Sequence, residues 1–168
     1  GRLEYIKGIL PLIDAYANYY QTHPSPLPLY IAGSGGPKYT ELVITKLQKY
    51  GIEHQVKMLG MINDVLPYYK EAKALIVPSL FEGFGFITAE AMFSGCLVIG
   101  NDVAGTKEQF DNGLELTGQE IALRYTTDAQ LVQHLIDVTN NPIDQYEPII
   151  LRAQEVVRQL YTAEKHVE

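Results

Sequence analysis

Short apolar blocks alternate with stretches of helical periodicity along most of this 168-residue chain. Apolar side chains from Ile9 to Tyr20 recur every three or four residues, which is the pattern of one helix face. The apolar block at 27–32 follows and runs into the glycine-rich segment 33–36, as a short buried strand does. This alternation predicts an α/β fold, in which an open parallel sheet carries helices on both faces.

The remaining elements continue the same alternation. Helices are predicted over 42–50, 65–72, 87–93, 106–111, 129–139 and 149–161, and strands over 56–60, 74–77, 96–100 and 121–125. The unbroken apolar run at 74–77 is typical of a parallel strand that is covered on both faces. We find no internal repeat, low-complexity tract or linker, so residues 1–168 are predicted to form a single domain.

Composition excludes several classes of protein. The chain has 13 Lys and Arg against 20 Asp and Glu, and its net charge of −7 counts against nucleic acid or an anionic membrane as the main partner. A few well-placed cations can still bind a small anion. The lone cysteine, Cys96, rules out an internal disulfide framework and suits a reducing compartment. No apolar run reaches the roughly 18–20 residues that span a bilayer, and no signal peptide opens the sequence.

The predicted fold indicates where a ligand binds. In open α/β sheets the binding crevice lies beyond the carboxyl ends of the strands. Three glycine-bearing segments follow predicted strands here, namely 33–36, 82–85 and the turn at Gly105. We call residues 82–85, Glu-Gly-Phe-Gly, the glycine loop. The segment 33–36 lacks both the full GxGxxG pattern and the P-loop pattern, so it predicts neither a dinucleotide site nor an ATPase.

The glycine loop has the features of an anion site. Gly83 and Gly85 remove side chains that would keep a ligand from the backbone. The amides of Ile87, Thr88 and Ala89, at the start of the next helix, can point at a phosphate at the positive end of the helix dipole.

Two carboxylates accompany this loop. Glu82 and Glu90 lie eight residues apart and can line one crevice, where each would accept hydrogen bonds from neutral hydroxyls. The structural alternative is that Glu90 only complements the helix start, while the glycines only form a turn. The residues alone leave both readings open.

Two cations near the start of the chain, Arg2 and Lys7, could bind a diphosphate, and Gly8 follows them. The planar guanidinium of arginine can form two parallel hydrogen bonds to phosphate, and the ammonium of lysine supplies a point charge. Two basic residues near a terminus are more often solvated surface, and that alternative also stays open.

The four histidines are scattered without the spacing of metal ligands, so we predict no metal site.

Taken together, these motifs resemble the C-terminal, donor-binding domain of retaining glycosyltransferases with the GT-B fold, the group 1 or family 4 class. The resemblance covers residues 1 to about 113 and is looser beyond. The motifs that carry it are Gly1-Arg2-Leu3, Lys7-Gly8, the glycine turn 32–35, Leu59-Gly60, the segment 78–85 and Glu90-Ala91-Met92.

The resemblance implies a role for each matching position. Arg2 and Lys7 would bind the donor diphosphate, and Glu82 would face the donor sugar, so these three are the expected catalytic residues. Glu90 would bond the ribose hydroxyls. The expected donor-binding positions are Phe84, Gly85 and Phe86 for the sugar, Ile87 and Thr88 for the phosphate, Gly35 beneath the nucleotide, and the stretch from Met58 and Leu59 to Met61 for the base.

The implied fold is one Rossmann-like half of a GT-B protein, and the implied reaction moves a sugar from a UDP-, GDP- or ADP-sugar to a glycan, lipid or other acceptor with retention. No metal cofactor is expected, since the sequence contains no Asp-x-Asp pair. An N-terminal acceptor domain is expected to be absent from this chain, which leaves it inactive or weakly active alone. The resemblance also implies a cytoplasmic protein of polysaccharide biosynthesis. Contact with the inner face of the membrane is expected only through the full-length protein.

Two alternatives remain: a catalytically silent nucleotide-binding module of the same fold, and a nucleotide-sugar epimerase.

The sequence also departs from the family pattern. Cys96 follows Gly95 where proline is usual, Thr106-Lys107-Glu108 replaces glycine-proline-glutamate, and 112–118 matches poorly. These departures leave the donor open.

Overall fold

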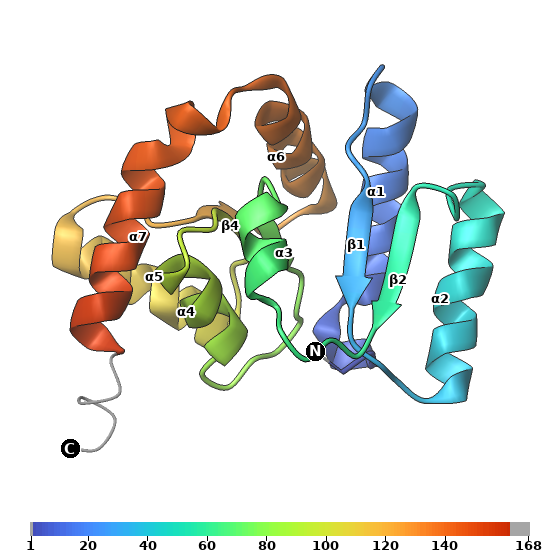
Figure 1. Cartoon of the computed structure of the whole chain (residues 1–168), viewed down its shortest axis with the longest axis horizontal. Coiled ribbons are helices and arrows are strands. Elements are labelled where there is room, and N and C mark those ends of the chain that lie inside the picture. Colours follow the sequence, from blue (N-terminus) through green and yellow to red (C-terminus); the bar gives the residue numbers. More distant parts are fainter. Residues whose placement is uncertain (1, 162–168) are drawn as a thin grey trace.

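The computed structural model describes residues 2–161, and Gly1 and residues 162–168, including His166, lie outside the described part. Helices and strands alternate as predicted (Figure 1). The helical elements are η1 (Tyr5–Lys7), α1 (Ile9–Thr22), α2 (Pro37–Tyr50), α3 (Leu66–Glu71), α4 (Phe86–Phe93), α5 (Ala104–Thr117), α6 (Asp128–Asn140), η2 (Ile143–Tyr146) and α7 (Glu147–Leu160). The strands are β1 (Leu29–Ala32), β2 (Val56–Gly60), β3 (Leu75–Val77), β4 (Val98–Asn101) and β5 (Leu123–Tyr125).

All strand pairs in the described chain are parallel. Backbone hydrogen bonds divide the strands into a two-stranded sheet, β1-β2, and a three-stranded sheet, β3-β4-β5. An isolated parallel bridge from Leu3 to Gly35, just beyond the end of β1, places the start of the chain beside the first sheet. The carboxyl ends of β1 and β2 point toward the end of the molecule where the N-terminus lies (Figure 1).

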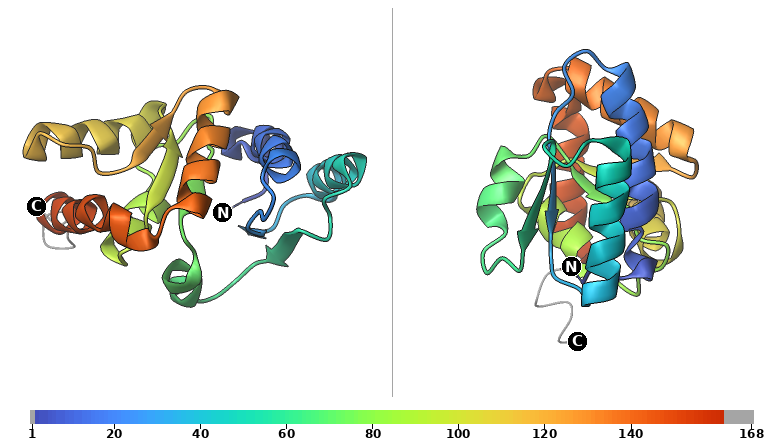
Figure 2. Two further views of the ribbon diagram at one scale, coloured as in Figure 1. Left: turned by 90° about the horizontal axis from the view of Figure 1, so that it is seen from above. Right: turned by 90° about the vertical axis from the view of Figure 1, so that its right-hand side faces the viewer.

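The sheet β3-β4-β5 separates two apolar cores. Leu97 and Ile99 join the core that includes α1 and α6, whereas Val98, between them, joins the core of α4, α5 and α7. Successive side chains of a strand point to opposite faces, so this apolar strand is covered on both sides. Figure 2 shows α1 and α6 on one side of this sheet and α5 and α7 on the other. The predicted fold class is confirmed.

Two helix boundaries differ from the prediction by more than two residues. Helix α2 begins at Pro37, five residues early, because proline already has the φ angle of a first helical turn. The helix predicted over 106–111 is present but longer, since α5 runs from Ala104 to Thr117 and ends at Gly118, where φ is +76°. Gly113 lies inside this helix, and Ile121 packs so closely on it that a Cβ there would lie 2.5 Å from Ile121 Cδ1.

The single thiol gives a first prediction. Cys96 is buried just before β4, and burial raises the pKa of its thiol to about 11. Because only the thiolate reacts, we expect the folded chain to react with a disulfide reagent at pH 8 about 100-fold more slowly than the urea-unfolded chain. Absorbance of the released chromophore measures both rates. Equal rates in the two states would contradict the buried position of this side chain.

Candidate functional site

The start of the chain packs against the segment that leaves β3. The Leu80 amide donates a 2.8 Å hydrogen bond to the Ile6 carbonyl oxygen. Gly8 has a φ of +72°, and a Cβ there would overlap the Pro78 carbonyl oxygen, so only glycine allows this approach. Lys7, the last residue of η1, is thereby held next to the residues that precede the glycine loop.

Lys7 and Glu82 form an ion pair at this point. Lys7 Nζ lies 2.8 Å from Glu82 Oε1, and the pair is largely shielded, with side-chain exposures of 28% and 13%. Ser79, which is buried, donates a second 2.8 Å hydrogen bond from Oγ to the same oxygen. Asn101, at the end of β4, donates from Nδ2 to the Ser79 carbonyl oxygen at 3.1 Å. Lys7 and Ser79 therefore hold the Glu82 carboxylate directly, and Asn101 supports it through Ser79.

Arg2 is exposed, and within the described residues it forms no hydrogen bond or ion pair with Lys7 or Glu82. The structure thus joins one of the two predicted cations to Glu82 and leaves the other at the surface beside Leu3. The pairing of Lys7 with Glu82 spans 75 positions and was not expected from the sequence.

Helix α4 begins directly behind the glycine loop. Its N-cap is Gly85, with a φ of +80° and no side chain to satisfy the first amides. The Thr88 amide bonds to the Gly85 carbonyl oxygen at 3.1 Å, whereas the first-turn amides of Phe86 and Ile87 have no acceptor within the helix. The Thr88 hydroxyl is buried and has no hydrogen-bond partner among the described residues. This helix start can therefore bind an anion.

Glu90 lies on the second turn of α4 and is exposed. Tyr69 of α3, which is buried, donates a 3.1 Å hydrogen bond from its hydroxyl to Glu90 Oε1. Burial first, and then the Glu90 carboxylate, raise the pKa of Tyr69. The tyrosine therefore stays protonated at neutral pH and holds the carboxylate against α3.

The predicted nucleotide positions lie at the ends of β1 and β2. A Cβ at Gly35 would overlap the Leu3 carbonyl oxygen, so this glycine is required by the close approach of the chain start. Met58 and Leu59 belong to β2, and the Met58 side chain packs against the first core.

Sequence reasoning missed three polar residues that support this region: Tyr69, Asn101 and Gln109, whose Nε2 donates to the Phe84 and Gly85 carbonyl oxygens. Tyr69 looked like one of many packing tyrosines, and Gln109 carries no motif. A polar residue at the carboxyl end of an apolar strand was the one available signal, and it applies to Asn101. Glu108, the retained acidic position, is exposed and forms no hydrogen bond or ion pair with the described residues.

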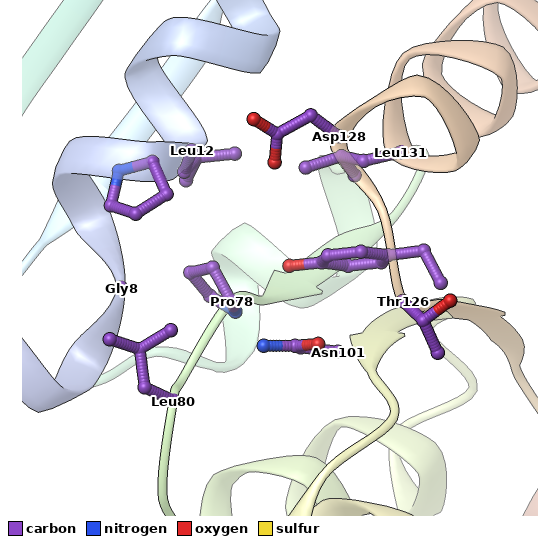
Figure 3. Close-up of a pocket in the computed structure, with 10 residues that line it drawn as sticks. Gly8, Leu12, Pro78, Leu80, Asn101, Thr126, Asp128 and Leu131 are labelled. Atoms are coloured by element: carbon purple, nitrogen blue, oxygen red, sulfur yellow. The ribbon is translucent and has the colours of Figure 1, made fainter.

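A small pocket lies beside this site, between α1 and α6 (Figure 3). Its volume is about 140 Å³, and it lies at the carboxyl ends of the strands, with Pro78, Asn101 and Tyr125 in its wall. None of the predicted site residues lines it. Asn101 thus borders the pocket while its amide group holds Ser79.

The described part of the chain contains neither a metal-binding cluster nor a membrane-spanning helix. Within residues 2–161, no three His, Cys, Asp or Glu side chains gather as a metal site would require. No helix in that part is both long enough and apolar enough to cross a membrane.

Comparison with solved structures identifies the fold. Sucrose-phosphate synthase from Thermosynechococcus elongatus matches 98% of this chain and 40% of its own, at a TM-score of 0.82 and 24% identity. HepE from Anabaena in complex with UDP-glucose matches 95% of this chain and 42% of its own, at a TM-score of 0.76 and 24% identity. These structures are GT-B glycosyltransferases, and the chain resembles one half of that fold.

Sequence comparison identifies the family. The chain is 40% identical over 111 residues to an uncharacterized glycosyltransferase of Methanocaldococcus jannaschii, which covers 64% of this chain and 27% of that protein. It is 30% identical over 115 residues to a glycogen synthase of Mycobacterium tuberculosis, which covers 67% of this chain and 27% of that protein. The chain thus spans about a quarter of the length of these relatives. Because the family model "Glycosyl transferases group 1" matches residues 1–156, nearly the whole chain, this chain belongs to the group 1 glycosyltransferases.

Proposed function

We propose that this chain binds a nucleotide-diphosphate sugar and forms the donor half of a retaining glycosyltransferase. The observation that carries the proposal is the Lys7–Glu82 pair beside the uncapped start of α4. One cation, one carboxylate and a set of free amides at one sheet edge suit a ligand with an anionic centre and flanking hydroxyls.

The diphosphate is the anionic centre in this proposal. When the bond to the sugar breaks, negative charge grows on the departing nucleoside diphosphate. Lys7 and the amides of Phe86 and Ile87 would stabilise this charge, with Arg2 as a second cation. Preorganised donors of this kind act where charge develops, and one donor is typically worth about 3 kcal/mol. Fixed cations and amides would perform this role without a metal ion.

The carboxylates suit the hydroxyls of the donor. Glu82 Oε1 already accepts bonds from Lys7 and Ser79, whereas Oε2 makes no hydrogen bond within the described chain. We assign Oε2 to a hydroxyl of the sugar, and we assign Glu90, held by Tyr69, to the ribose. The front-face route, in which the acceptor attacks from the side of the leaving group, retains configuration and needs no covalent role for Glu82.

The nucleotide is assigned to the edge between Gly35 and Glu90. The backbone of Met58 and Leu59, at the end of β2, would then face the base. The Anabaena protein HepE has been solved with UDP, and with UDP-glucose, which supports a nucleotide sugar as the ligand class. We propose a hexose linked to UDP, GDP or ADP, used in polysaccharide assembly in the cytoplasm.

We further propose that an acceptor domain packs over this edge in the full-length protein. Exposed apolar side chains gather on the segments that follow the strands and on the starts of nearby helices. They are Tyr5, Met61, Leu80, Phe81 and Phe86. Such a surface suits contact with another protein segment or with the donor. The chain alone is then expected to bind donor yet transfer little.

Replacing Lys7 by alanine is expected to weaken binding of the preferred donor about tenfold, since it removes one charge-assisted contact to phosphate. Calorimetric titration of the chain with UDP-, GDP- and ADP-linked sugars would first identify that donor and then compare the variants. Lys49→Ala provides the matched control, because Lys49 is an exposed lysine at the far end of α2 and should leave affinity unchanged.

The same titrations separate the outcomes. If the unmodified chain binds no nucleotide sugar at millimolar concentration, the proposed function is wrong. Equal losses in the Lys7 and Lys49 variants would show that overall charge, rather than the position of Lys7, drives binding. Donor binding without any transfer by the full-length protein would favour the catalytically silent alternative.

A further inference from the structure

Helix α5 holds the glycine loop at two places. The Gly105 amide donates a 2.9 Å hydrogen bond to the Glu82 carbonyl oxygen. One turn later, Gln109 Nε2 donates to the carbonyl oxygens of Phe84 and Gly85, the second at 2.9 Å. Positions four apart share one helix face, so a single face of α5 fastens the whole loop.

Gln109 is an unusual residue for this place. Its side chain is only 2% exposed, and its oxygen Oε1 has no hydrogen-bond partner among the described residues. Burying an amide oxygen without a partner is costly. A methionine of similar length would fill the space without that cost, so what the glutamine adds is its pair of N–H hydrogen bonds to the loop.

These bonds set the direction of two loop amides, together with the Thr88 and Ala89 amides of α4, which also donate to the Gly85 carbonyl oxygen at 3.1 and 3.4 Å. A peptide group is planar and trans, so its carbonyl oxygen and its N–H point in opposite directions. The carbonyls of Phe84 and Gly85 point at Gln109. The N–H groups in the same two peptides belong to Gly85 and Phe86, and they must therefore point away from α5. Turning either peptide over would present a carbonyl oxygen in place of the N–H.

The fit between α5 and the loop leaves little room for another arrangement. Gly85 has a φ of +80°, and a Cβ there would lie 3.0 Å from Gln109 Nε2. At the other contact, a Cβ on Gly105 would overlap the Gly83 carbonyl oxygen. Side chains are thus missing where the helix and the loop come closest, and the Gln109 amide occupies the space beside Gly85.

We propose that Gln109 is a positioning residue, which aims the amides of Gly85 and Phe86 at the sugar diphosphate of the donor. The inference rests on the proposed function, because it assigns a ligand to those amides. A phosphate attracts N–H groups and repels carbonyl oxygens, so the orientation of the two peptides decides whether the loop binds or rejects the anion.

Two substitutions test this role. Gln109→Met keeps the length of the side chain but cannot donate, so we expect donor affinity to fall about tenfold at every pH. Gln109→Glu can donate only when its carboxyl is protonated, and burial beside carbonyl oxygens favours that neutral form. We therefore expect its affinity, relative to the unmodified chain, to be low at pH 8 and to recover as the pH falls to 5.

Gln154→Met is the matched control. Gln154 on α7 donates from Nε2 to the Phe93 carbonyl oxygen at 3.2 Å, so it holds the opposite end of the same helix α4. Its loss should leave donor affinity unchanged at both pH values. All titrations are run where circular dichroism shows each variant to be folded, and a Met variant that does not fold leaves the pH profile of the Glu variant as the test.

The outcomes separate the inference from the proposed function. Weakened binding by the Met variant, with recovery of the Glu variant at low pH, supports the positioning role. If the unmodified chain binds a nucleotide sugar and both variants bind it equally well at pH 8, Gln109 has no such role although the proposed function stands. If the unmodified chain binds no nucleotide sugar, both proposals fail.

Discussion

Replacing Gly105 by alanine is expected to lower the free energy of unfolding by about 3 kcal/mol. A Cβ at this position would overlap the Gly83 carbonyl oxygen and lie 2.7 Å from the Glu82 carbonyl oxygen. Both are backbone atoms, so neither can rotate aside as a side chain would. The chain must move the glycine loop away from α5, and the 2.9 Å bond from the Gly105 amide to Glu82 would then be lost.

The tertiary contact and the helix propensity of alanine predict changes of opposite sign in the free energy of unfolding of the Gly105→Ala variant. Gly105 lies within α5, where alanine would by propensity stabilise a helix by about 1 kcal/mol. Urea unfolding, monitored by circular dichroism, measures the difference in the free energy of unfolding between the variant and the parent. Gly83→Ala is the control, because a Cβ at Gly83 meets nothing within 4 Å and stability should change by no more than about 0.5 kcal/mol. A Gly105 variant as stable as the parent would show that α5 does not approach the loop as described.

The second large effect is expected at Arg124, whose guanidinium links three carboxylates. Its Nη1 lies 2.6 Å from Asp111 Oδ1 and 3.0 Å from Asp102 Oδ1, and its Nε lies 2.8 Å from Glu120 Oε2. The group also lies over the Phe110 ring, with 5.4 Å between Cζ and the ring centroid. Burial opposes its charge, but the hydrogen bonds from the guanidinium to these acids raise the pKa of Arg124. The cation therefore reduces the repulsion among three acids around α5 and β5.

We expect Arg124→Met to lower the free energy of unfolding by about 2 kcal/mol at pH 7, between the values for exposed and buried pairs. The methionine retains part of the packing on Phe110 but leaves the carboxylates facing one another. Arg158→Met is the control, since its single 3.1 Å pair with Glu155 is exposed and should contribute less than about 0.5 kcal/mol. Thermal unfolding compares the variants, and equal losses at the two positions would contradict the role of the linked acids.

The pH dependence of the Arg124 effect follows from Asp111. Hydrogen bonds from Lys107 and then from Arg124 hold the pKa of this carboxyl below its ordinary value of 3.8. A carboxyl whose pKa is lowered in the folded state adds stability above its unfolded pKa and loses it as the pH falls through the folded pKa. The difference between the parent and the Arg124 variant should therefore be steady near neutral pH and become smaller below pH 3.8. A difference that grows on acidification would contradict this assignment.

Local patterns predicted most of the elements. The three- and four-residue spacing from Ile9 to Tyr20 lies within α1, and the apolar run at 74–77 contains β3. Both succeed because the spacing of apolar residues must match the period of the element that buries them. The glycine loop also stands out, since Gly85 adopts a φ of +80° that few other residues tolerate.

Where prediction failed, contacts between distant segments were the reason. The Asn112-Gly113 pair resembles the end of a helix, yet α5 continues through it, and the glycine leaves the space in which Ile121 packs. Gln109 carries no local signal, and its contacts with the glycine loop arise only because α5 lies against a loop about 25 positions earlier. The partners of such side chains depend on the path of the chain.

By itself, the sequence determined the order of helices and strands, and the sheet edge that it indicates for a ligand stays a prediction. Only the tertiary structure decided that Lys7 pairs with Glu82, that Tyr69 holds Glu90, and that Arg2 stands apart at the surface. The physical reason is one of range. Periodicity and backbone preference act within a few residues, whereas an ion pair between positions 75 apart forms only after packing has brought two separate elements together.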